Sequence, residues 1–175
     1  MAKVPFSKLK CKVNEEIKTI SFNDEIIEVK QYLPVQDKLS LIGRVIELAH
    51  DQDHNYSNPV KADVFRDLEI VFNYTNISFT EKQKEDIPKL YDQLTSSGLM
   101  EIIMEAIPEE ERNGIDIGIY DSIESVYKYQ NSVLGVLDTI KSDYSNMKLD
   151  IDNLNNTITD PEALAFVKSM LTNIN

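Results

Sequence analysis

Residues 17–49 read IKTISFNDEIIEVKQYLPVQDKLSLIGRVIELA, and the spacing of their apolar residues changes once along this stretch. Before Pro34, two β-favouring runs flank Asn23-Asp24, a pair that tolerates the positive φ of a tight turn. These runs predict a β-hairpin at 17–30. Pro34 itself fits the first turn of a helix that ends near His50. The apolar residues with helical spacing in that helix are Leu39, Ile42, Val45, Ile46 and Ala49.

Helical spacing continues after a polar loop that is expected at 51–61. A second helix is predicted at roughly 62–75. The run Thr80-Glu-Lys-Gln83 has the pattern of a capping box, which predicts a further helix toward Ser96. Pro88 should kink or divide that helix, and Gly98 should stop it. The inward side chains of the second helix are predicted to be Val64, Leu68, Val71 and Phe72.

The C-terminal half is also expected to be helical. A short helix at 99–106 ends before Pro108, and Glu109-Glu110-Glu111 favours a helix N-terminus through the helix dipole. The longest pattern, at 116–145, predicts about seven turns whose only internal weak point is Gly135. Its apolar positions are Ile119, Ile123, Val126, Tyr127, Val133, Leu134, Leu137, Ile140 and Tyr144. The spacing at 147–159 is ambiguous, and Asp160-Pro161-Glu162 predicts the start of a last helix.

The expected fold class is therefore mainly α, a helical bundle of about six helices with an N-terminal β-hairpin. A chain of 175 residues is long enough for one core with a small appendage. We expect a basic N-terminal arm at 1–14 and a single helical domain at 15–175. An isolated hairpin is marginally stable, so the hairpin at 17–30 should pack on the helices.

The charge is distributed unevenly along the chain. The whole chain carries 30 acidic against 18 basic residues, a net charge of −12, which argues against general nucleic-acid binding. Residues 1–12 nevertheless hold four lysines and no acid: Lys3, Lys8, Lys10 and Lys12. This arm is either a solvated terminus or a segment that docks on an acidic neighbouring subunit or on nucleic acid. In the docked case its apolar anchors are Phe6, Leu9 and Val13.

A later region of the chain has the opposite charge. Residues 92–127 hold nine acids against Arg112 alone, a net charge of −8. The region is a solvated face, a docking face for a basic partner, or a mimic of DNA phosphate. It could also receive the basic arm of another copy, head to tail. The acidic residues expected to take part in such contacts are Glu101, Glu105, Glu109, Glu110, Glu111 and Asp116.

No residue pattern predicts an enzyme, a cofactor or a metal. Cys11 lacks a placed His, and the chain has no nucleophile elbow or Gly-rich phosphate loop. The segment 50–57 has the spacing of the first ligands of a calcium-binding loop. However, Tyr56 stands where that loop requires Gly, and Ala62, further along the chain, stands where it requires the bidentate Glu. We therefore interpret it as a solvated loop. The tyrosines of the long helix are expected to be half-buried in the core, or to lie at an interface: Tyr120, Tyr127, Tyr129 and Tyr144.

The first residues lack a secretory signal, and no apolar run is long enough to span a membrane. The lone Cys11 cannot form an internal disulfide. These features predict a protein that stays or assembles inside a cell, with no membrane partner.

Two stretches resemble a known group of proteins: EVKQYLPVQDKL at Glu28–Leu39 and YTNISFTEKQKED at Tyr74–Asp86. With the Ile/Asn/Lys-rich composition, they resemble small uncharacterised proteins from the virion-assembly regions of phages and prophages of low-GC Gram-positive bacteria. The plan of a short β start and acidic helices is similar to phage tail assembly chaperones. The resemblance covers residues 13–145 and contains no catalytic or binding motif, so it assigns no functional residue.

Two functions follow as expectations. The first is a phage virion structural or assembly protein, such as a tail, neck or connector component or an assembly chaperone. It would act by contacts with other phage structural proteins or with itself, in the virion or the host cytoplasm. The alternative is a phage-encoded acidic inhibitor of a basic host protein that binds nucleic acid or acts in defence.

Overall fold

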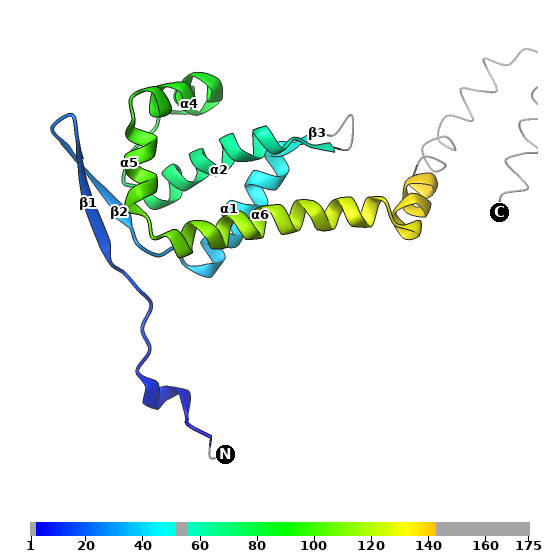
Figure 1. Cartoon of the computed structure of the whole chain (residues 1–175), viewed down its shortest axis with the longest axis horizontal. Helices are drawn as coiled ribbons and strands as arrows, with labels where there is room; N and C mark the ends of the chain where they lie inside the picture. The colour runs from blue at the N-terminus through cyan, green and yellow to red at the C-terminus, as the bar shows by residue number, and fades with distance from the viewer. Residues whose placement is uncertain (1–2, 52–55, 143–175) are drawn as a thin grey trace, which may run out of the picture. The chain divides into compact units, whose positions relative to one another are not determined.

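Helices make up most of the computed structural model, which describes residues 3–51 and 56–142, and a β-hairpin lies near the N-terminus (Figure 1). This confirms the predicted fold class. The elements are η1 (Phe6–Leu9), β1 (Ile17–Phe22), β2 (Glu25–Lys30), α1 (Val35–Ala49), β3 (His50–Asp51), β4 (Tyr56–Ser57), α2 (Pro59–Tyr74), α3 (Glu81–Glu85), α4 (Ile87–Ser96), α5 (Leu99–Ala106) and α6 (Glu109–Gln130). Residues 133–142 are helical as well.

The chain divides into two compact units, Met1–Glu124 and Ser125–Asn175, which are described separately below. The first unit contains the hairpin and the packed helices. The described part of the second unit consists of the end of α6 and the helical residues 133–142. The expected arm at 1–14 and single domain at 15–175 stay predictions.

The hairpin forms as predicted, with β1 and β2 antiparallel and Phe22 opposite Glu25. Asn23 and Asp24 have φ values of 50° and 66°, as a two-residue turn of this kind requires. Ile27 and Val29 of β2 are buried in the core, and Val29 forms an isolated bridge with Thr75. The marginal hairpin is thus held by the helices beside it.

Helix α1 lies against α2, and its buried stripe is Leu41, Val45 and Ala49. Leu39, one of the apolar residues with helical spacing, does not belong to this stripe, because its side chain is 58% exposed. Leu39 and Leu41 are two residues apart and so point to nearly opposite sides of a helix. The predicted place of Pro34 is also shifted, since it is the N-cap and the first turn begins at Val35.

The polar loop expected at 51–61 is shorter than predicted. His50 pairs with Ser57 and Asp51 with Tyr56 in a short antiparallel ladder. Helix α2 then begins at Pro59, because the Asn58 side chain accepts hydrogen bonds from the backbone N–H groups of Val60 and Lys61. Of the side chains predicted to face inward, Leu68 and Val71 are buried, while Val64 and Phe72 are partly buried.

The segment from Thr80 to Pro108 follows the prediction. Thr80 and Gln83 form the predicted capping box at the start of α3. The helix is divided at Asp86, and Pro88 lies in the first turn of α4. Gly98, with a φ of 77°, ends the turn after α4 and begins α5.

The long helix differs most from its prediction. Helix α6 already begins at Glu109, so the three consecutive glutamates form its first turn. It ends at Gln130, and Asn131-Ser132 interrupts the seven continuous turns that were expected. The Ser132 side chain caps the next helical stretch by accepting from the Gly135 N–H at 3.1 Å. The pattern at 147–159 and the helix predicted after Asp160-Pro161 lie outside the described residues.

The core of the first unit is built from β2, α1, α2, α4, α5 and α6. Ile115 and Ile119 are fully buried and join α6 to this core. Gly118 permits the close approach of α6 to α1, since a Cβ there would lie 2.6 Å from Cδ1 of Ile42.

Candidate functional site

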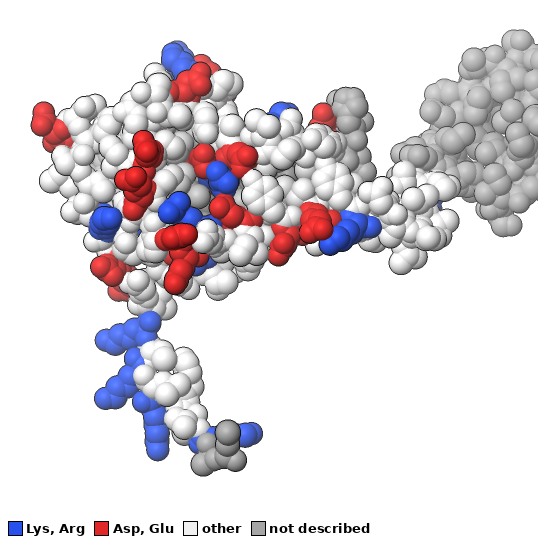
Figure 2. All heavy atoms as spheres, viewed as in Figure 1, with Lys and Arg blue, Asp and Glu red and all other residues white. Residues whose placement is uncertain are grey.

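The basic arm presents its whole described length to solvent. Phe6 and Leu9 lie in the single turn η1 and are exposed, as is Val13. All four lysines, Lys3, Lys8, Lys10 and Lys12, are exposed too. In Figure 2 the arm shows blue side chains and no red ones. The arm therefore offers positive charge and apolar side chains together.

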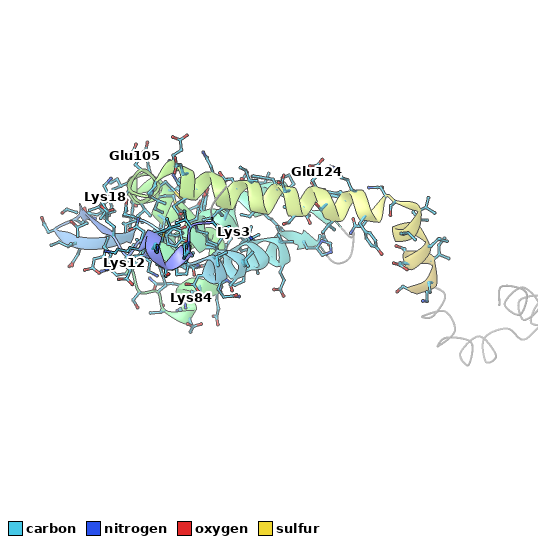
Figure 3. The ribbon with its side chains drawn as sticks, turned by 90° about the horizontal axis from the view of Figure 1, so that it is seen from below. Lys3, Lys12, Lys18, Lys84, Glu105 and Glu124 are labelled. Carbon is cyan, nitrogen blue, oxygen red and sulfur yellow. The ribbon has the colours of Figure 1, made fainter. Side chains whose placement is uncertain are left out.

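The expected acidic residues occupy two neighbouring elements. Glu101 and Glu105 lie one turn apart on α5, and Glu109 and Glu110 lie in the first turn of α6. All four side chains are exposed. Glu105 points outward from its helix, as does Glu124 on α6 (Figure 3). Within the described residues, no ion pair joins these acids to the lysines of the arm.

Glu111 differs from the other acids because it points into the first unit. Its Oε1 accepts from Lys38 Nζ at 2.7 Å, and its Oε2 accepts from the Tyr74 hydroxyl at 2.9 Å. The backbone N–H of Leu33 donates to Oε2 at 3.3 Å. Lys38 also lies over the ring of Tyr32, 4.4 Å from its centroid. Glu111 thus joins α6, α1, α2 and the segment after β2, a structural role that its sequence position does not reveal.

This cluster makes the stability of the protein sensitive to alkaline pH. Burial raises the pKa of Tyr74 well above its ordinary value of 10.0, and the hydrogen bond to Glu111 raises it further. The fold therefore favours the neutral phenol. Its contribution to stability is fully present below the unfolded pKa and is lost as the pH rises above it.

We predict that the unfolding free energy of the wild type falls more steeply above about pH 10 than that of Tyr74→Phe. The difference in slope approaches about 1.4 kcal/mol per pH unit, the value for one proton. Urea unfolding at a series of pH values measures it. At neutral pH, Tyr74→Phe should cost only about 1 kcal/mol for the lost hydrogen bond. Equal alkaline slopes would contradict this prediction.

A second charged cluster surrounds Arg66 on α2. Its guanidinium lies 3.1 Å from Asp63, 2.9 Å from Asp67 and 3.4 Å from Asp116. Burial lowers the pKa of Arg66, but these carboxylates, Asp67 foremost, outweigh burial and raise it. The Tyr120 hydroxyl donates to Asp63, and the Tyr91 hydroxyl donates to Asp67 at 3.2 Å. Asp116, expected among the exposed acids, is thus half-buried beside a cation.

An apolar groove runs along α2 on the surface of the first unit. One pocket of about 660 Å³ and another of about 480 Å³ share Leu48, Phe65 and Ile87. The rim of the larger pocket holds Arg44, which donates to the buried Glu69 through Nε at 2.9 Å and through a terminal nitrogen at 2.6 Å. The lining carries no Cys, His or nucleophile paired with a base. The apolar side chains of Leu48, Phe65 and Ile87 suit this groove to an apolar side chain.

Metal and thiol chemistry find no further support among the described residues. Within 3–51 and 56–142, no three His, Cys, Asp or Glu side chains are grouped so as to hold a metal. His50 Nδ1 lies 3.4 Å from the Ser57 hydroxyl in the short ladder. Cys11 is exposed on the arm, and its Sγ donates to the Leu9 carbonyl oxygen at 3.9 Å.

The tyrosines of the long helix, expected to be half-buried in the core or to lie at an interface, differ from one another in their exposure. Tyr120 and Tyr129 are exposed, and each hydroxyl donates to a carboxylate, that of Asp63 and that of Asp138 respectively. Tyr127 is partly buried, and Tyr144 lies outside the described residues.

No family model, no curated protein and no solved structure matches this chain. None of the helices in the described part of the chain is both long and apolar enough to cross a membrane. No local sequence pattern predicts the Glu111 and Arg66 clusters, because their partners lie up to 78 residues apart along the chain.

Proposed function

We propose that this protein is a phage virion structural or assembly protein, of the tail, neck, connector or assembly-chaperone kind, that acts through protein–protein contacts. The observation that carries the proposal is the arm at residues 3–13. There, four lysines and the apolar side chains of Phe6, Leu9 and Val13 are all exposed. Exposed apolar side chains beside positive charge are the kind of surface that marks a contact with another protein.

The chain also provides a surface of opposite charge. Glu101, Glu105, Glu109 and Glu110 are exposed at the junction of α5 and α6 and have no intrachain lysine partner from the described arm. Positive arm and negative junction on one chain fit a head-to-tail contact between copies, or contacts with two different virion components. The proposed place of action is the virion or the host cytoplasm.

The test reverses the charge of the arm and keeps its length. In the variant with Lys3, Lys8, Lys10 and Lys12 changed to Glu, we expect association with purified virion components to weaken at least tenfold at low salt. Wild-type binding should weaken with added salt, because the contact is electrostatic. Pull-down and sedimentation of the full chain measure both.

The matched control changes four lysines outside the arm, Lys18, Lys61, Lys82 and Lys89, to Glu. It alters the net charge equally and should leave association intact. A second variant of this chain has Glu101, Glu105, Glu109 and Glu110 changed to Lys. If the arm variant binds to this second variant, the acidic surface at the junction of α5 and α6 is the surface that the arm contacts. If arm and control variants bind equally well, the proposed role of the arm is wrong.

A further inference from the structure

The second unit exposes an apolar helix face that nothing in the described chain covers. Side chains of this face are exposed by 40% at Val126, 77% at Val133, 54% at Leu137 and 58% at Ile140. We call these four residues the seam. Leu134 and Val136 beside them are exposed as well. Scattered exposed apolar residues are normal, but several of them close together at the end of α6 and on the helical residues 133–142 mark an interaction surface.

The seam has the spacing of a coiled coil. Val126, Val133 and Ile140 are seven residues apart, and Leu137 lies four residues after Val133 and three before Ile140. In heptad letters, Leu137 is an a position and the other three are d positions. The same alternation of three and four residues continues in the sequence through Tyr144, Met147, Ile151, Leu154 and Ile158. Gln130 is the one polar residue in this series.

We propose that the seam binds further copies of this chain as a parallel coiled coil. A heptad seam is complementary to itself, since in register each a position meets a and each d position meets d. The charge agrees with this occupant. Although the whole chain has a net charge of −12, residues 125–142 hold only Lys128, Asp138 and Lys141. Copies of an acidic protein can therefore meet here without strong repulsion; Figure 2 shows the described part of this segment largely white.

Parallel, in-register helices bring like heptad positions together, so Leu137 and Ile140 would each meet their own copies on the neighbouring chains. Leu at a with Ile at d, as at 137 and 140, favours three or four helices over two.

The helix of the single copy is bent where the coiled coil needs it straight. Asn131-Ser132 interrupts it, and Ser132 caps the next turn through the Gly135 N–H. A Cβ on Gly135 would lie 2.1 Å from the Tyr129 carbonyl oxygen, so the bend requires glycine. In a straight helix, position 135 is an f position that faces away from the seam and tolerates alanine. On association the Ser132 cap is lost and the seam side chains become buried.

The experiment follows the oligomeric state of the full chain by sedimentation and light scattering over a concentration series. Wild type should form trimers or tetramers. Leu137→Asp should raise the dissociation constant at least about a hundredfold, because it buries an unpaired charge in the seam. The matched control, Ser142→Asp, puts the same carboxylate on the outward f face and should associate like wild type.

Gly135→Ala tests the bend. It should lower the dissociation constant at least about fivefold per chain, because alanine favours continuous helix and is excluded from the bent form. A monomeric wild type at every concentration, or equal association of Leu137→Asp and wild type, would overturn the proposal. Weaker association of Gly135→Ala than of wild type would contradict the proposal that the helix straightens on association. Deletion of residues 2–12 should leave this association unchanged, which separates the seam from the proposed function of the arm.

Discussion

Leu41→Ala is expected to lower the free energy of unfolding by about 3 kcal/mol. The Leu41 side chain is fully buried between α1 and the core of the first unit. Truncation to alanine removes its transfer free energy and leaves a cavity that the packed neighbours fill only in part. Urea unfolding followed by circular dichroism measures the change as a shift of the midpoint at constant slope.

The matched control is Leu39→Ala on the same helix. Leu39 is 58% exposed, so its truncation should change the unfolding free energy by less than about 0.5 kcal/mol. Both substitutions make the same chemical change two residues apart, and only the direction of the side chain differs. A larger loss for Leu39→Ala than for Leu41→Ala would show that α1 packs in the other register.

Glu111→Ala should lower the free energy of unfolding by about 3 kcal/mol. It leaves the half-buried ammonium of Lys38 without its carboxylate and the buried Tyr74 hydroxyl without its acceptor. An unpaired charge and an unpaired donor at such a site each lose stability that their pairing had supplied. Thermal and urea unfolding at neutral pH measure the loss.

Glu110→Ala is the control for this prediction. Glu110 lies beside Glu111 in the first turn of α6 but is exposed, so it shares the favourable interaction with the helix dipole and lacks the buried partners. Its removal should cost about 0.5 kcal/mol. The double variant Lys38→Met with Glu111→Leu should recover part of the loss, because it removes both charges together. Equal losses of unfolding free energy for Glu111→Ala and Glu110→Ala would contradict the proposed cluster.

Local signals predicted the features that depend on neighbouring residues. Asn23-Asp24 closes the hairpin, Thr80 and Gln83 form their capping box, and Gly98 adopts positive φ. The start of α2 is also encoded locally, by Asn58 before Pro59, although the helical spacing alone predicts a start near residue 62. The seven-residue spacing of Val126, Val133 and Ile140 is also present in the sequence, but spacing alone does not show whether these side chains face the core or another chain.

The fold class, the hairpin and helix ends such as those at Thr80 and Gly98 follow from the sequence alone, because backbone conformation at turns and caps is set within a few residues. Packing between distant segments, in contrast, selects which side chains face inward and which acids pair inside the protein. Leu41 rather than Leu39 is buried because α2 covers that side of α1. Glu111, unlike Glu110, points at Lys38 and Tyr74, partners 73 and 37 residues away. Such choices depend on the packing of distant segments, which no local pattern of residues encodes.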